Sequence, residues 1–321
     1  MLDRRQLLTA TAAIPLASLA QAASFPSRAV TIVVAYPPGG PSDVLARAIA
    51  EKLSRTWGQP VVVDNKSGAN GIIATEAVMR AAPDGHTILM HLTGYIQNVS
   101  LYRKVPYDPF KDLSPVTQLG TQAMGLAVSQ SSRFTSFSAL ADAMKMTPSE
   151  FSYGSFGVGS TGHIFGELLK SNLEVSIPHI PYRGESLMLP DLLAGRVSLG
   201  FVSAAAAVNR QRDGTLRILA ISGPKRHPQL PQVPTLDEVG MKGFNVVGWY
   251  GLFVPKDTAA HTVAKIAEDT RKALSTPDIA DRMKDLSIEP TGTSPAEFAK
   301  LLRTDYSRWD DLIKKFQIVA E

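Results

Sequence analysis

The chain carries Tyr36-Pro37-Pro38-Gly39-Gly40-Pro41-Ser42-Asp43 between an apolar run and a helical pattern, and this arrangement sets its architecture. The apolar run, Val30–Ala35, predicts a buried strand, while apolar residues from Val44 to Leu53 recur at helical spacing. Ser42 has the residue type of a helix N-cap. The two glycines let backbone N–H groups approach a ligand, and the helix dipole favours an anion there. An ordinary strand–helix turn that binds nothing would show the same pattern.

Short Gly-rich loops between strands and helices continue along the chain. A loop at Asn65–Gly71 leads into a helix, and the turn Pro83-Asp84-Gly85 leads into the strand His86–Leu92. This repeated order predicts parallel sheets flanked by helices, whose ligands bind at the carboxyl ends of the strands. The turn-rich segment Tyr107–Pro115 precedes a second unit with its own alternation. Two such units predict a small-molecule cleft between two lobes.

Composition narrows the possible functions. The 321 residues suffice for about two domains, and the net charge of +4 is too mild to indicate nucleic-acid binding. The chain has no cysteine, and its six histidines lack the spacing and the carboxylate neighbours of a metal site. No nucleophile–base pair stands out. We therefore expect neither an enzyme nor a cofactor or metal.

The N-terminus predicts export. Arg4 and Arg5 precede the mildly apolar segment Leu7–Leu19, and Ala20-Gln21-Ala22 has the small-x-small pattern of a cleavage site. The apolar segment is too short to span a membrane. We expect residues 1–22 to be a twin-arginine-like signal, removed after Ala22, and the mature protein to lie in the periplasm without membrane insertion. A membrane-anchored tail is the alternative interpretation.

A second Gly-rich loop, Tyr153–His163, also joins a strand to a helix. Within it, Gly157–Gly162 matches G-x-G-x-x-G, the dinucleotide fingerprint, and Arg183 lies about where a 2′-phosphate is read. An exported NADP-dependent oxidoreductase is therefore an alternative function. P-loop spacing is also present, but His163 replaces the required lysine. The remaining N–H groups and hydroxyls suit hydrogen bonding to a carboxylate.

Several single residues have two interpretations each. His163 could donate to a ligand or bond local backbone. Asp43 could act as a base, but more readily pins the first loop by accepting local N–H bonds. Trp249 and Tyr250 could stack on a ligand or belong to the core. Arg183 could pair with a distal carboxylate or form a surface ion pair.

A set of short motifs is spread in order over nearly the whole mature chain. They are Pro37-Pro38-Gly39-Gly40 with Asp43, Val61–Asn65 before Gly68–Gly71, Ala82–Thr87, Tyr107–Asp112, Gly154–Ser160 with His163, Pro181–Gly184, Asp191–Gly195 and Val233–Gly240. Each motif is modest alone, but their order is specific. The chain resembles the periplasmic substrate-binding proteins of tripartite tricarboxylate transporters, the Bug-type (TctC-like) family.

The resemblance implies an α/β, two-lobed periplasmic-binding-protein (Venus flytrap) fold, type II-like, with a mostly parallel sheet in each lobe. Lobe 1 is expected at 23–122 plus 245–321, and lobe 2 at 123–244. It further implies a monomer that captures a small organic acid and delivers it to a membrane permease. In similar proteins, backbone N–H groups and waters of the first loop hold a ligand carboxylate, and loops of the other lobe complete the site. The ligand-binding residues predicted on this basis are Tyr36, Pro38, Gly39, Gly40, Ser42, Asp43, His91, Thr93, Gly94, Ser155, Gly157, Ser160, Thr161, His163, Tyr182, Arg183, Gly184 and Ser203.

Three stretches depart from the family pattern. His91-Leu92-Thr93 replaces small hydroxyl residues after the third strand, Leu187-Met188-Leu189 replaces a Pro-Ala pair, and Ser198 replaces an acid. His91 and Leu92 lie where they could shape the pocket. These departures bear on the identity of the ligand more than on the fold.

Overall fold

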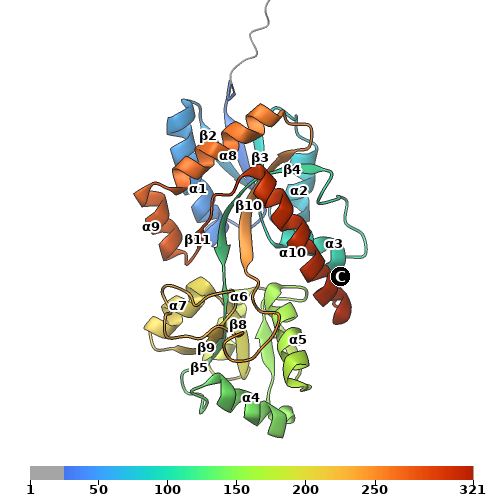
Figure 1. The fold of residues 1–321 in the computed structure, drawn as a ribbon, viewed down its shortest axis with the longest axis vertical. Coiled ribbons are helices and arrows are strands. Elements are labelled where there is room, and N and C mark those ends of the chain that lie inside the picture. Colours follow the sequence, from blue (N-terminus) through green and yellow to red (C-terminus); the bar gives the residue numbers. More distant parts are fainter. Residues whose placement is uncertain (1–24, 321) are drawn as a thin grey trace, which may run out of the picture.

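Two α/β lobes lie end to end in the computed structural model, which describes residues 25–320 (Figure 1). The expected export signal at 1–22 lies outside these residues. Lobe 1 is built on a six-stranded sheet and lobe 2 on a five-stranded sheet. The chain leaves the first sheet after Gln122, enters the second at Met124 and returns at Gly248. The predicted two-lobed α/β fold is confirmed.

Lobe 1 takes its elements from both ends of the described chain. The N-terminal part contains β1 (Val30–Val34), α1 (Pro41–Trp57), β2 (Val61–Asn65), α2 (Ile72–Met79), β3 (Thr87–Leu92), α3 (Gly94–Leu101) and β4 (Leu113–Gln122). The C-terminal part contains β10 (Gly248–Pro255), α8 (Ala260–Leu274), α9 (Pro277–Asp285), β11 (Glu289–Pro290) and α10 (Pro295–Lys315). The strand order across the sheet is β11-β4-β10-β3-β1-β2.

Lobe 2 is formed by the middle of the chain. It contains β5 (Met124–Ser129), α4 (Phe137–Met146), β6 (Tyr153–Ser155), α5 (Thr161–Leu173), β7 (His179–Pro181), α6 (Glu185–Leu193), β8 (Leu199–Ser203), α7 (Ala204–Arg212) and β9 (Leu216–Ile221). The strand order is β7-β6-β8-β5-β9.

Both sheets are mixed, but four of the six strands in lobe 1 and four of the five in lobe 2 run in one direction, so the prediction of mostly parallel sheets is confirmed. β1 pairs in parallel with β2 and β3, but β10 runs antiparallel to β3 and β4. In lobe 2, β6 pairs in parallel with β7 and β8, while β5 runs antiparallel to β8 and β9. The strand–helix alternation correctly indicates the parallel pairs. β5 and β10 arrive from the other lobe without a crossover helix, and nothing fixes them in the parallel direction.

The first helix begins before Ser42, so the prediction that Ser42 caps it is wrong. Helix α1 starts at Pro41 with extended Gly40 as its N-cap, and no side chain makes a capping bond there. Proline suits this first position because its fixed φ is helical and it has no N–H to leave unpaired. Ser160 and Ser203, in contrast, cap α5 and α7 with their hydroxyls.

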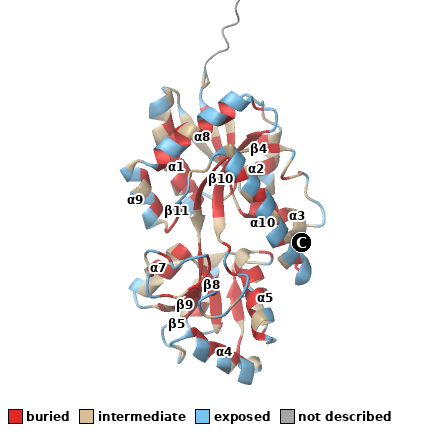
Figure 2. Ribbon diagram, in the orientation of Figure 1, coloured by how far each residue is buried: buried red, intermediate tan, exposed pale blue. Residues whose placement is uncertain are grey.

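Buried residues lie between the sheets and the helices in each lobe, and one packed cluster continues from lobe 1 into lobe 2 (Figure 2). Trp309 of α10 belongs to this cluster and stacks on Phe165 of α5, with 5.8 Å between ring centroids. On the lobe 1 side, Ser100 of α3 donates a hydrogen bond to Asp310 of α10 at 2.7 Å. Helix α10 therefore joins the two lobes by packing, in addition to the strand crossings. Within residues 25–320, no helix combines the length and the apolar character needed to cross a membrane.

Candidate functional site

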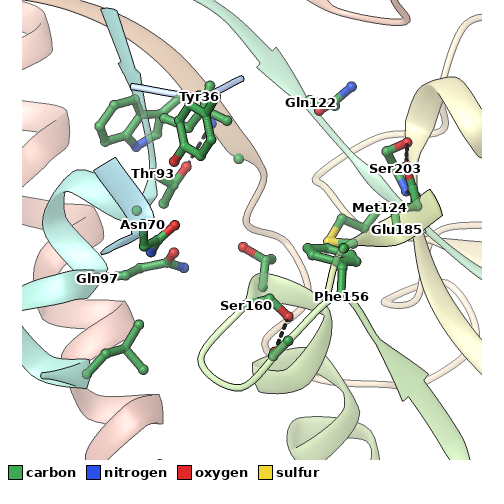
Figure 3. A pocket seen from close by; sticks show the side chains of 18 of the residues that line it. Tyr36, Asn70, Thr93, Gln97, Gln122, Met124, Phe156, Ser160, Glu185 and Ser203 are labelled. Carbon is green, nitrogen blue, oxygen red and sulfur yellow. Dashed lines mark hydrogen bonds between the residues drawn. The ribbon is translucent and has the colours of Figure 1, made fainter. Parts of the chain in front are cut away.

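A cavity of about 550 Å³ lies between the two lobes, a volume that suits a small molecule. Figure 3 shows side chains from both lobes converging on it. The lining residues from lobe 1 and the crossings are Tyr36, Asn70, Leu92, Thr93, Gly94, Gln97, Leu101, Tyr102, Gln122, Gly248, Trp249 and Tyr250. Those from lobe 2 and its entry are Ala123, Met124, Phe156, Gly157, Val158, Ser160, Thr161, Gly184, Glu185 and Ser203.

The lobe 1 wall is centred on the first turn of α3. Gly94 starts this helix at the cavity, and a Cβ there would lie 3.1 Å from the Tyr36 hydroxyl. Gln97, one turn further on, is buried, and its Nε2 amide has no hydrogen-bond partner among the described residues. Asn70 donates to Asn98 at 2.7 Å, which fixes its side chain at the wall. The helix N-terminus and the unpaired amide both offer N–H groups to an anion.

The lobe 2 wall is formed largely by the second Gly-rich loop. The Ser160 hydroxyl donates to the Gly157 carbonyl at 2.7 Å and accepts from the His163 N–H at 3.3 Å. Ser160 and Thr161 both face the cavity. Because Ser160 closes the loop and caps α5 at once, the loop holds a fixed shape at the cavity wall.

Two stacked histidines support this loop from behind. The rings of His163 and His179 lie 4.0 Å apart between centroids, the Gly159 N–H donates to His163 Nδ1 at 3.1 Å, and the Ser155 hydroxyl contacts His179 Nε2 at 2.7 Å. Burial, and then the charge of His163, lower the pKa of His179 to about 4. His163 therefore bonds local backbone in this structure, one of its two predicted roles.

Glu185 is the only acid or base of the Asp, Glu, Lys, Arg and His types among the lining residues. It begins α6, and its carboxylate accepts hydrogen bonds from the Ser203 N–H at 2.5 Å and the Ser203 hydroxyl at 2.8 Å. Burial raises the pKa of Glu185, and the two bonds from Ser203 oppose that rise. The cavity therefore has one acidic position on an otherwise neutral wall.

Some of the predicted site residues line this cavity and others do not. Those on its wall are Tyr36, Thr93, Gly94, Gly157, Ser160, Thr161, Gly184 and Ser203. Those not on its wall are Pro38, Gly39, Gly40, Ser42, Asp43, His91, Ser155, His163, Tyr182 and Arg183. The second group lies one layer behind the wall or in neighbouring turns.

The first Gly-rich loop is closed on itself by Asp43. The Asp43 carboxylate accepts from the Gly39 N–H at 2.9 Å and pairs with Arg47 at 2.9 Å. Burial acts to raise the pKa of Asp43, but these hydrogen bonds outweigh it and hold the pKa below its usual value. The prediction that Asp43 pins the loop is confirmed.

His91 shapes the lobe 1 wall from behind. It is fully buried, its ring lies 5.6 Å from that of Tyr36, and a Cβ on Gly71 would come within 2.1 Å of its Nε2 atom. Burial lowers the pKa of His91 to about 4, against the opposing hydrogen bonds to Leu92 and Gly71. Its imidazole is therefore neutral at pH 7 and supports Tyr36, which reaches the cavity.

The sequence interpretation missed several lining residues, chiefly Asn70, Gln97, Gln122, Phe156 and Glu185. Gln97 lies one turn after Gly94, so helical spacing could have indicated it. Glu185 directly follows the predicted Tyr182–Gly184 stretch. Gln122 carried no local signal, because it lies at a lobe crossing. Among residues 25–320, no three His, Asp or Glu side chains gather in a way that could hold a metal ion.

Two α/β lobes around a small-molecule cavity define a solute-binding protein of the periplasmic type. Residues 45–318 match the model of the tripartite tricarboxylate transporter family receptor, TctC, and the chain belongs to this family. The resemblance to TctC-like proteins is thereby confirmed. The family consists of solute-binding receptors, not enzymes, so the oxidoreductase alternative is not supported.

Relatives match along most of the chain. A "UPF0065 protein in tcbD-tcbE intergenic region" of a Pseudomonas species is 38% identical over 92% of this chain and 89% of its own length. Protein BugT of Bordetella pertussis is 30% identical over 96% of this chain and 95% of its own length. The solved periplasmic binding protein BugD has 32% identity and a TM-score of 0.80, covering 92% of this chain and 100% of that one.

Two solved neighbours carry carboxylates. A protein of R. palustris with adipate has 33% identity and a TM-score of 0.82, covering 92% of this chain and 99% of that one. MatC from Rhodopseudomonas palustris with bound malate has 33% identity and a TM-score of 0.78, covering 90% of this chain and 100% of that one.

Proposed function

We propose that this protein captures a small organic acid in the periplasm and presents it to a membrane permease of the tripartite tricarboxylate type. The observation that carries the proposal is Gln97, whose amide N–H₂ is buried at the cavity wall without a partner among residues 25–320. A buried donor left unpaired destabilises the protein, so a ligand oxygen that accepts from it gains free energy. Adipate and malate in the two solved neighbours supply the same chemistry.

The two walls offer complementary groups to a carboxylate. Gln97 and the first turn of α3 provide N–H groups from lobe 1, and Thr161 brings a hydroxyl to the wall from lobe 2. Closure of the lobes excludes water and strengthens each hydrogen bond to the anion. A ligand that touches both lobes therefore favours the closed state.

The periplasmic location rests on the twin-arginine-like N-terminus with its cleavage pattern at Ala20-Gln21-Ala22, and on the solved relative BugD, a periplasmic binding protein. The permease partnership rests on membership of the transporter receptor family.

A thermal-shift screen of residues 23–321 tests the proposal. The panel contains mono-, di- and tricarboxylates, aromatic acids, amino acids, NADP and NADPH. At about a hundredfold excess over Kd, a bound acid stabilises the protein by about 2.7 kcal/mol, which a melting curve resolves. A shift with the dinucleotides alone, or with no acid, contradicts the proposal.

The substitution Gln97→Leu locates the ligand. It keeps the side-chain volume and removes the amide, so we expect roughly tenfold weaker acid binding or more, the value of a hydrogen bond to a charged group. Gln130→Leu, at an exposed position of lobe 2 away from the cavity, is the matched control and should bind normally. The melting temperature of each unliganded variant verifies folding. Equal affinities in the two variants would place the acid elsewhere.

A further inference from the structure

The cavity has opposite chemical character at its two walls. Gln97 and the start of α3 offer N–H donors on the lobe 1 side, while Glu185 stands on the lobe 2 side (Figure 3). No Lys, Arg or His is among the lining residues, and Glu185 takes part in no ion pair within residues 25–320. An acid-binding cavity therefore contains an acidic side chain that the protein itself leaves without a cation.

The two hydrogen bonds that Glu185 accepts from Ser203 stabilise its charged form, whereas burial disfavours that form. Each of its two oxygens accepts a bond from Ser203, one from the N–H and one from the hydroxyl. The Ser203 hydroxyl also accepts from the Ala206 N–H at 3.2 Å and keeps its own proton free to donate to Glu185. An ionised carboxylate accepts at both oxygens, and these two bonds suit that form. The N-termini of α6 and α7, where Glu185 and Ser203 lie, add favourable dipoles.

A negative charge on Glu185 would discriminate among organic acids. A second ligand carboxylate near Glu185 would meet a like charge with little water between them, whereas a ligand ammonium group would complete an ion pair. An uncharged end would leave Glu185 partly desolvated without compensation. The cavity wall also includes Tyr36, Phe156 and Trp249, whose rings suit an apolar ligand body.

Building on the proposed function, we propose that the ligand is a zwitterion, with its carboxylate at Gln97 and the start of α3 and its protonated amine paired with Glu185. The substrate class is thus an amino acid, α or ω, in place of a di- or tricarboxylate. Glu185 is the residue that determines this specificity.

Matched ligands test the inference by calorimetric titration of the mature chain. One series has five carbons: L-norvaline, 5-aminopentanoate, pentanoate and glutarate. A second series is aromatic: L-phenylalanine, 3-phenylpropanoate and benzylsuccinate. Within the series that fits the cavity, we expect the amine-bearing acid to bind about tenfold or more tightly than the monocarboxylate, and the dicarboxylate to bind worst.

The substitution Glu185→Gln assigns the effect to this side chain. It keeps the length and an oxygen that can accept from Ser203, so the fold should persist, as the melting temperature verifies. We expect it to abolish the preference for the amine and to improve dicarboxylate binding. Glu150→Gln changes the net charge equally at an exposed position of lobe 2 and should leave every affinity unchanged.

The outcomes separate this inference from the proposed function. If acids bind but the amine gives no advantage, or if Glu185→Gln leaves the preference intact, the inference is overturned and acid binding stands. If only acids without an amine bind in the wider panel, the inference is likewise overturned. If no acid binds at all, both the inference and the proposed function fail.

Discussion

The two Gly-rich loops have similar sequences, but they contribute differently to the cavity wall. Each follows a strand and opens a helix, and each has glycine at positive φ. In the first loop, only Tyr36 lines the cavity, and the Gly39 N–H is already taken by Asp43. In the second, Phe156, Gly157, Val158, Ser160 and Thr161 form part of the wall. The Gly157 and Gly159 N–H groups of the second loop are also taken, by Ser155 and His163. A glycine pattern therefore indicates the turn, while the fold decides whether that turn forms part of the cavity wall.

The substitution Asp43→Ala should distinguish the roles of the two loops most clearly. It removes a buried acceptor that holds the Gly39 N–H and Arg47, so we expect the free energy of unfolding to fall by about 2 to 3 kcal/mol. Acid affinity should change little, because Asp43 does not reach the cavity. Urea unfolding and calorimetric titration measure the two effects. Asp64→Ala, at a half-exposed surface ion pair, should cost less than about 1 kcal/mol. A large loss of affinity with normal stability would show that the first loop binds the ligand directly.

Acid pH should weaken the support of the second loop, while the Asp43 contacts that close the first loop persist. The fold favours neutral His179, whose pKa is lowered to about 4. Its contribution is fully present above the unfolded pKa of about 6.5 and is lost as the pH falls toward 4. Between pH 7 and pH 5 we expect the free energy of unfolding to fall by roughly 1 kcal/mol, because solvent screens the charge of this partly exposed ring. Asp43 stays ionised in this window because its pKa is below its usual value.

The variant His179→Gln measures how much of this loss of stability at acid pH comes from His179. Urea unfolding at pH 7 and pH 5 should show a smaller decrease in the variant than in the natural chain. His91, with a pKa also near 4, contributes a decrease of its own that the variant retains. Equal decreases in both proteins would mean that His179 does not couple the loop to pH.

The smallest expected difference in stability is between substitutions of Ser160 and Ser42, the serines at the starts of α5 and α1. Ser160→Ala removes a capping hydroxyl and the bond to Gly157, so we expect a loss of about 1 kcal/mol in stability together with weaker acid binding. Ser42→Ala removes no capping bond and should change stability by a few tenths of a kcal/mol. Thermal melts with and without ligand compare the pair. A larger effect at Ser42 would reverse the assignment of the caps.

Local sequence patterns predicted the helices and strands better than they predicted strand direction or the roles of single residues. The strands predicted at Val30–Ala35 and His86–Leu92 and the helix predicted through Val44–Leu53 are observed as β1, β3 and α1, and the two-lobed class followed from the order of the motifs. The antiparallel direction of β5 and β10 depends on how the chain passes between lobes, which no local pattern encodes. Gln97 and Glu185 are ordinary residues in sequence. Only the fold shows that one is an unpaired donor and the other an isolated charge at the same cavity.

Trp309 of helix α10 is one of three tryptophans whose fluorescence can report on ligand binding. The chain has three tryptophans, and each lies in a different setting: Trp57 bonds Asp269 within lobe 1, Trp249 lines the cavity, and Trp309 stacks on Phe165 across the lobe junction. Indole emission responds to polarity and to nearby rings. The proposed closure of the lobes would change the surroundings of Trp249 and Trp309 and leave Trp57 as an internal reference. Ligand capture can therefore be followed in real time by the intrinsic fluorescence of the unlabelled protein.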